Sequence, residues 1–89
     1  MSEHIVDRLK GIIAGKLDVN LKKEDIDENV SLFEDGLGLD SIAIVELIVN
    51  IEKEFDISIQ DDELNAGLFR SLIVLGEFIG EKTGLEMVR

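Results

Sequence analysis

The segment Ile42–Phe55 constrains the fold most, because it holds no glycine or proline and repeats its apolar residues at helical intervals. It predicts a helix over Ser41–Phe55, with Asp40 as the N-cap residue. One stripe of this helix has the spacing of a core-facing surface and consists of Ile44, Leu47, Ile48, Ile51 and Phe55. A second stripe lies beside it and consists of Ile42, Val45 and Val49.

The rest of the chain predicts a small all-α protein, a four-helix bundle with three longer helices, one short helix and a long first loop. We expect the other long helices at about Glu3–Lys16, capped by Ser2, and at Leu72–Lys82, capped by Ser71. The short helix is expected at Glu63–Gly67. Irregularly spaced apolar residues between 18 and 39 predict a long connection that its own side chains anchor. No segment alternates with period two for long enough to form a sheet.

Length and composition predict one soluble, cytoplasmic domain over residues 1–89, with its core at about 3–82 and frayed residues at 85–89. The chain is 45% apolar with four Phe and no Trp or Tyr, so the core should consist mainly of Ile, Leu and Val. It has no cysteine, which excludes disulfides and thiolate metal sites. No apolar run approaches the roughly 18 residues that span a bilayer, and the N-terminus lacks a signal-peptide pattern, so we expect no membrane insertion.

The net charge of −11 is unevenly distributed along the chain. Eight acids and one base between Asp40 and Glu63 give −7, whereas the other 65 residues carry −4. Such a surface repels nucleic acid and anionic membranes. The acids alternate with Ile, Leu and Val, which favours a folded acidic face over a disordered tail.

Ser41 is the residue best placed for chemistry, because it stands where a glycine-containing loop, residues 36–40, meets the predicted helix. Its hydroxyl would lie beside the unpaired backbone N–H groups of the first turn. A phosphate attached there would be held by those donors and by the positive end of the helix dipole. The alternative is an ordinary serine at a helix start.

The second apolar stripe allows two interpretations. Glu46, Glu52 and Lys53 decorate the same side of the predicted helix. A helix in a small bundle needs only one buried stripe, so this second one favours a docking surface of small apolar groups rimmed by acids. The alternative is burial against the long loop or the short helix.

Metal binding and catalysis find little support in the sequence. An EF-hand-like series of oxygen ligands runs through residues 25–31, but Val30 and Gly36 occupy the positions that need a glycine and a bidentate glutamate. His4, the single histidine, is expected on the surface of the first helix, and nothing in the spacing places it beside Ser41. No GK[ST] sequence follows the glycines. We therefore predict neither an enzyme nor a metal site.

The sequence resembles the acyl carrier protein family, which includes the peptidyl carrier domains, over nearly the whole chain up to about Lys82. The resemblance rests on residues 37–42 (LGLDSI), 45–47 (VEL) and 51–57 (IEKEFDI). It implies that Ser41 carries 4′-phosphopantetheine, transferred from coenzyme A by a Mg²⁺-dependent phosphopantetheinyl transferase. The arm would hold acyl chains as thioesters, and Asp40 would cap the helix and help to position the transferase's metal.

The resemblance also implies the other partners, which are acyl-processing enzymes of fatty acid, polyketide or related biosynthesis with basic docking patches. The positions that match the family's recognition surface are Ile42, Val45, Glu46, Val49 and Glu52. Charges on this surface would steer the encounter, and its apolar contacts would fix the docked pose. We expect the carrier to act as a monomer.

Several positions depart from carriers of fatty acid synthesis. Ala43 and Ile44 stand where those carriers usually have polar residues, the loop has an additional glycine at Gly36, and Lys53 replaces a usual acid. These differences make a specialised carrier, with restricted partners or an unusual acyl cargo, at least as good an expectation as a housekeeping one. A peptidyl or aminoacyl carrier, and an unmodified acidic interaction module, are the remaining alternatives.

Overall fold

The structure is a computed structural model that describes residues 3–17, 19–33 and 35–83. The described residues form three α-helices and three short 3₁₀ helices, with no strand among them. No helix in this part of the chain is both long and apolar enough to cross a membrane. In chain order the elements are α1 (Glu3–Lys16), η1 (Lys23–Asp25), α2 (Ser41–Phe55), η2 (Asp61–Glu63), η3 (Ala66–Phe69) and α3 (Leu72–Thr83).

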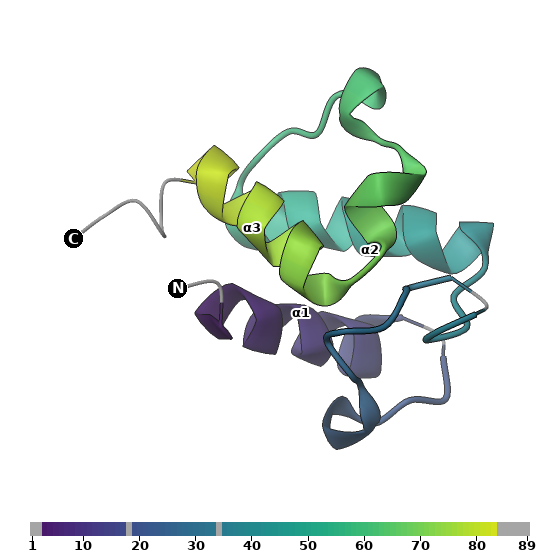
Figure 1. The fold of residues 1–89 in the computed structure, drawn as a ribbon. Helices are drawn as coiled ribbons and strands as arrows, with labels where there is room; N and C mark the ends of the chain where they lie inside the picture. Colours follow the sequence, from purple (N-terminus) through teal and green to yellow (C-terminus); the bar gives the residue numbers. More distant parts are fainter. Residues whose placement is uncertain (1–2, 18, 34, 84–89) are drawn as a thin grey trace.

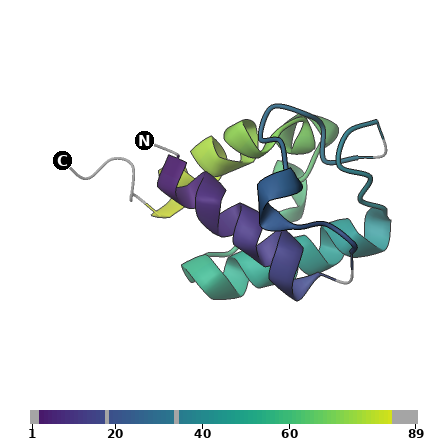
Figure 2. The same ribbon diagram turned by 90° about the horizontal axis from the view of Figure 1, so that it is seen from below.

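The three α-helices surround one apolar core, and α1 contacts both α2 and α3 (Figure 1). Seen from below, α1 lies across α2 at an angle (Figure 2). η1 packs against α1, and η3 packs against α3. Isoleucine and leucine dominate the interior, and the largest fully buried side chains are Ile5, Leu9, Ile13, Leu32, Leu39, Leu47, Ile51, Leu72, Leu75 and Ile79.

The predicted long helices are confirmed, with α1 and α2 at the expected residues and α3 one residue longer than expected. Ser71 caps α3 as predicted, because its Oγ accepts a hydrogen bond from the backbone N–H of Val74 at 3.1 Å. The predicted cap at Ser2 and the predicted fraying of residues 85–89 lie outside the described residues.

The short fourth helix expected at Glu63–Gly67 is not found as an α-helix. Two 3₁₀ turns, η2 and η3, occupy this region, with the extended residue Asn65 immediately before η3. The side chain of Asn65 accepts a hydrogen bond from the backbone N–H of Leu68 at 3.2 Å, which starts a new turn instead of continuing the old one. The described fold is therefore all-α with three α-helices and short 3₁₀ connections.

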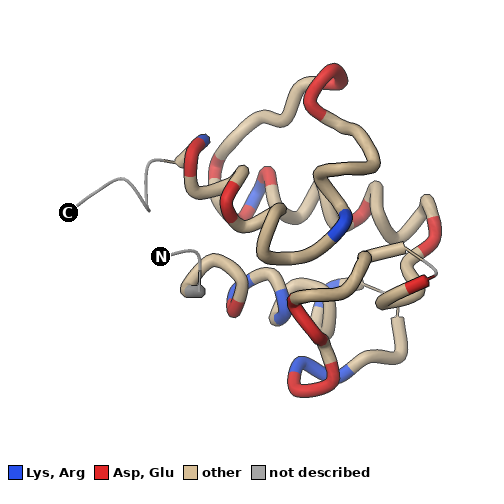
Figure 3. The backbone as a smooth tube through the Cα atoms, in the orientation of Figure 1, with Lys and Arg blue, Asp and Glu red and all other residues tan. Residues whose placement is uncertain are grey.

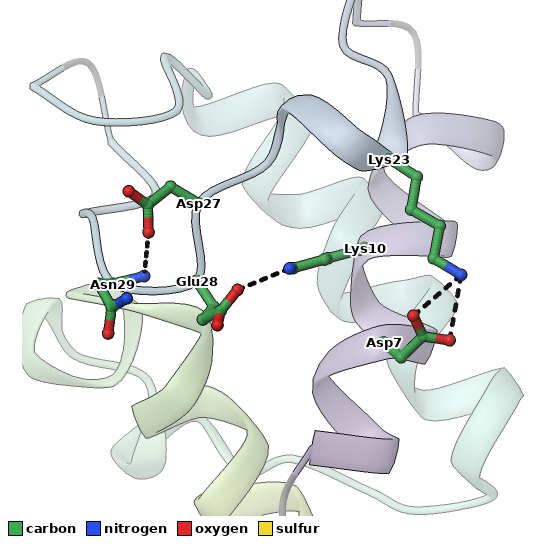
Figure 4. A network of polar contacts seen from close by, with 6 residues as sticks. All are labelled: Asp7, Lys10, Lys23, Asp27, Glu28 and Asn29. Carbon is green, nitrogen blue, oxygen red and sulfur yellow. Dashed lines mark hydrogen bonds and ion pairs between the residues drawn. The ribbon is translucent and has the colours of Figure 1, made fainter.

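The long first connection is anchored as predicted, with Ile26, Leu32 and Leu39 buried in the core. Ion pairs also tie it to α1, from Lys10 to Glu28 at 2.6 Å and from Lys23 to Asp7 at 3.0 Å (Figure 4). The backbone carbonyl of Glu28 accepts a hydrogen bond from the N–H of Ile73, so this segment reaches α3 as well. Glu28 thereby links α1, the loop and α3.

The EF-hand-like residues of this loop have local roles. The carboxylate of Asp27 accepts a hydrogen bond from the backbone N–H of Asn29 at 2.8 Å, an Asx turn (Figure 4). Among the described residues, no group of three or more histidine, aspartate or glutamate side chains is placed to hold a metal ion.

Candidate functional site

Asp40 opens α2 with the geometry of an N-cap residue. Its backbone is extended, with φ −87° and ψ −179°, and its carboxylate accepts a hydrogen bond from the backbone N–H of Ala43 at 2.8 Å. Its carbonyl accepts the first hydrogen bond of the helix, from the N–H of Ile44 at 2.9 Å. The predicted cap is confirmed, and it fixes the residue that follows as the first residue of the helix.

Ser41 is that first residue, and its side chain is exposed. Asp40 satisfies the third N–H of the first turn, and within the described residues the N–H groups of Ser41 and Ile42 have no acceptor. These two donors and the positive end of the helix dipole favour an anion beside the Ser41 hydroxyl. A hollow of about 220 Å³ adjoins it, lined by Val19, Gly38, Asp40, Ile42, Ala43 and Glu46.

A tightly folded loop presents Ser41. The backbone N–H of Leu37 donates to the carbonyl of Ser31 at 2.7 Å, and the N–H of Gly38 donates to the carbonyl of Phe33 at 2.8 Å. A Cβ atom at Gly36 would lie 1.9 Å from the Ser31 carbonyl oxygen, so only glycine fits there. Gly38 has φ +85°, a conformation that also favours glycine.

This loop is fastened to the core from both sides of its turn. Leu32 and Leu39 are buried and hydrogen-bond each other through the Leu39 N–H and the Leu32 carbonyl at 3.0 Å. The Leu32 N–H donates to the carbonyl of Phe69 in η3, and the rings of Phe33 and Phe69 meet edge to face at 6.0 Å. The loop therefore holds the start of α2 at a fixed place relative to η3.

The second apolar stripe of α2 faces outward. Ile42 is 69% exposed, Val45 is 59% exposed and Val49 is 42% exposed, the large apolar side chains that stand out from the surface of the described residues. The core stripe is buried as predicted at four of its five positions, and Ile48 is half-buried. Burial of the second stripe against the loop or the short helices does not occur.

Acidic residues flank this stripe. α2 and η2 are predominantly acidic (Figure 3). The bases are concentrated elsewhere, since five of the nine lie between Arg8 and Lys23. Glu46 is exposed, whereas Glu52 is half-buried and its carboxylate accepts a hydrogen bond from the backbone N–H of Ile59 at 2.9 Å. Glu46 and Glu52 are the two acids predicted to meet a partner. Glu52 differs from Glu46 because it also accepts a hydrogen bond within the protein.

Sequence reasoning missed the residues that shape the loop before Ser41. Ser31 supplies both a carbonyl acceptor for Leu37 and a hydroxyl acceptor for the Phe33 N–H at 3.0 Å. The signal in the sequence is Gly36, whose lack of a side chain indicates a close backbone approach. Its partner lies five residues earlier, and no local pattern identifies it. His4, predicted to be a surface residue of the first helix, is exposed on α1.

The sequence is similar to a known protein family and to several of its members. Residues 7–78 match the family model described as "Phosphopantetheine attachment site". The acyl carrier protein of Clostridium perfringens (strain SM101) is 43% identical over 77 residues, which cover 86% of this chain and 95% of that protein. The acyl carrier protein of a Picosynechococcus species is 37% identical over 87 residues, 94% and 98% of the two chains. That of Buchnera aphidicola subsp. Acyrthosiphon pisum (strain Tuc7) is 49% identical over 61 residues, 68% and 72%.

The all-α fold and the match to a phosphopantetheine attachment site together indicate a carrier protein. Proteins of this class transport a bound group and do not transform it. This chain belongs to the acyl carrier protein family, and it carries acyl chains on phosphopantetheine. The family works with acyl-processing enzymes and is modified by phosphopantetheinyl transferase. The matches favour an acyl carrier over the peptidyl carrier and over the unmodified interaction module.

Proposed function

We propose that Ser41 is the residue that receives the 4′-phosphopantetheine arm. The observation that carries this proposal is the exposed Ser41 hydroxyl at the first residue of α2, beside two backbone N–H groups that have no acceptor in the described part of the chain. Transfer would form a bond between Ser41 Oγ and the phosphorus that carries the pantetheine, break the pyrophosphate bond of coenzyme A, release adenosine 3′,5′-bisphosphate and pass the hydroxyl proton to a base of the transferase. The N–H groups of Ser41 and Ile42 would hold the phosphodiester at the helix N-terminus and stabilise its negative charge. When bound, the arm supplies the thiol that a chain without cysteine lacks.

The roles of the surrounding residues follow from their positions. Asp40 fixes the start of the helix, and in this proposal it also helps to position the Mg²⁺ of the transferase. The hollow beside Ser41, with Val19 and Ile42 among its lining residues, offers space next to the attachment point. The protein's contribution is to present and protect the arm, while other enzymes carry out the chemistry.

Intact mass measures this assignment directly. Incubation with coenzyme A, Mg²⁺ and a broad-specificity transferase is expected to add one phosphopantetheine to the wild-type chain and none to Ser41→Ala. Ser58→Ala is the matched control, because Ser58 is also exposed but lies outside any helix. An unchanged mass of the wild type, or full addition to Ser41→Ala, would reject Ser41 as the attachment residue.

We further propose that the exposed stripe of α2 is the docking surface for the transferase and the acyl-processing enzymes. Its apolar part is Ile42, Val45 and Val49, and Glu46 and Glu52 supply the charge that attracts basic patches. The matched pair Val45→Thr and Glu46→Gln separates the two contributions. The threonine variant should raise KM for modification at all salt concentrations, whereas the glutamine variant should lose its effect as salt screens the surface. Equal KM values for both variants and the wild type would exclude this surface from transferase docking.

A specialised role, as a monomer in the cytoplasm, completes the proposal. The high negative charge of the chain opposes self-association. Three of the departures from housekeeping carriers have a structural explanation. Ala43 and Ile44 are buried at 6% and 8% exposure and serve the core, and Gly36 leaves no room for a side chain beside the Ser31 carbonyl. The exposed Lys53 is then the departure that remains to change partner choice. Comparing acyl loading by fatty acid and polyketide enzymes on wild type and Lys53→Glu tests this, with a shift toward the fatty acid enzymes expected for the variant.

A further inference from the structure

A second apolar hollow lies away from the α2 stripe, between the η2–η3 segment and α3. It has a volume of about 430 Å³, and its apolar lining includes the buried Leu68 and the half-buried Val74 and Phe78. Its acidic lining consists of Glu63, Glu77 and Glu81. Val74 and Phe78 are four residues apart on α3, as are Glu77 and Glu81, so an apolar row and an acidic row run side by side along this helix. We name this hollow the η3–α3 groove.

Two residues that line the groove, Glu63 and Phe78, already contact a cation of the chain itself. The Lys82 ammonium lies 2.9 Å from a carboxylate oxygen of Glu63 and 5.6 Å from the centre of the Phe78 ring. An ammonium group is thus held between a carboxylate and an aromatic face. This uses the charge of Glu63, while within the described residues Glu77 and Glu81 have no ion-pair partner.

We propose that the η3–α3 groove binds a cationic segment of a partner protein, in which an arginine or lysine stands next to an aliphatic side chain. The cation pairs with Glu77 and Glu81, and the aliphatic group contacts Val74 and Phe78. Charge complementarity selects this occupant, because the net charge of −11 repels anionic lipid and nucleic acid. The groove shares no residue with the α2 stripe, so the carrier offers partners a second, separate contact.

Peptide binding in the η3–α3 groove needs neither Ser41 nor the arm that it carries. The test therefore uses the full chain with Ser41→Ala, so that failure of the attachment proposal cannot affect the result. The probe is a short peptide in which arginine alternates with leucine, blocked at both ends. Its control has serine in place of each leucine and the same charge. Binding is followed by the backbone amide NMR shifts of the protein.

The expected shifts concentrate at residues 66–69 and 74–81. Glu77→Gln/Glu81→Gln should weaken peptide binding by about five- to tenfold, because each exposed ion pair contributes a few-fold. The charge-matched control Glu24→Gln/Asp25→Asn changes two exposed acids at η1 and should weaken binding by less than about twofold. The serine peptide should bind several-fold more weakly than the leucine peptide.

Four outcomes would overturn the proposal. They are shifts centred on residues 42–49, equal weakening by the two double variants, equal binding of the two peptides, and no detectable binding of the leucine peptide. The first assigns the cation to the α2 stripe, and the second and third reduce the effect to general charge attraction.

Discussion

The carboxylate of Glu52 accepts a hydrogen bond from the backbone N–H of Ile59 at 2.9 Å and so ties the last turn of α2 to the connector that follows. Glu52→Ala would leave a half-buried N–H without a partner and should lower the free energy of unfolding by about 1 kcal/mol. Glu52→Gln keeps an acceptor oxygen and should lose much less. Urea unfolding of the two variants measures the difference.

Partner binding tests separately whether the charge of Glu52 also attracts basic enzymes. Glu52→Gln removes the charge and should weaken docking, although the protein stays nearly as stable as the wild type. Unchanged docking of this stable variant would restrict Glu52 to its structural bond.

Asp40 should contribute to stability through its cap. Asp40→Ala removes the acceptor for the Ala43 N–H and should cost about 1 kcal/mol, while Asp40→Asn keeps an acceptor oxygen and should cost a few tenths. Thermal unfolding followed by circular dichroism measures both. If the two variants lose equal stability, the negative charge of Asp40, not its cap hydrogen bond, is the stabilising feature.

How much of this site the sequence predicts depends on the range of the interactions involved. The bounds of α2 and its cap depend on neighbouring residues, and both were predicted. The η2–η3 turns were not, because the Asn65 side chain competes with helical hydrogen bonds and the apolar pattern does not record this. The hydrogen bond from the Ile59 N–H to the Glu52 carboxylate was also not predicted, because Ile59 lies beyond the end of the helix.

Replacement by alanine should change the free energy of unfolding in opposite directions at Gly36 and Gly11, because their surroundings differ. Gly36→Ala forces a Cβ against the Ser31 carbonyl and should destabilise by about 2–3 kcal/mol. Gly11 lies in α1, and a Cβ atom added there would meet no neighbouring heavy atom within 4 Å, so Gly11→Ala should stabilise by about 0.5–1 kcal/mol. Urea midpoints that move in the same direction for both variants would contradict the close approach at Gly36.

Three ion-paired glutamates make stability sensitive to acid. A hydrogen bond from Lys10 lowers the pKa of Glu28 below its ordinary value of 4.5, and one from Arg8 does the same to the pKa of Glu54. For Glu63, the backbone N–H of Gln60 is the main cause of the lowered pKa, followed by Lys82.

Because these folded-state pKa values are lowered, the unfolded chain binds more protons in the acid range. The stabilisation is fully present above the ordinary pKa and is lost as the pH falls through the lowered values.

Lys10→Met should return the pKa of Glu28 toward its ordinary value and reduce the acid dependence of unfolding. Lys22→Met is the control, since Lys22 has no ion pair within the described residues. Carboxyl NMR titration that gives Glu28 the same pKa in both variants would contradict the assigned cause.

Asp56 ends α2 in a left-handed conformation, with φ 55° and ψ 51°, which is uncommon for a residue with a side chain. Its negative charge also lies at the negative end of the helix dipole. Asp56→Gly removes both penalties and should raise the free energy of unfolding by about 1 kcal/mol. Ser58→Gly is the control in the same connector, because Ser58 does not have positive φ and should lose stability on gaining freedom in the unfolded chain. Urea unfolding of the two variants should therefore shift in opposite directions, and a loss of stability in Asp56→Gly would mean that the carboxylate contributes more than the strained backbone costs.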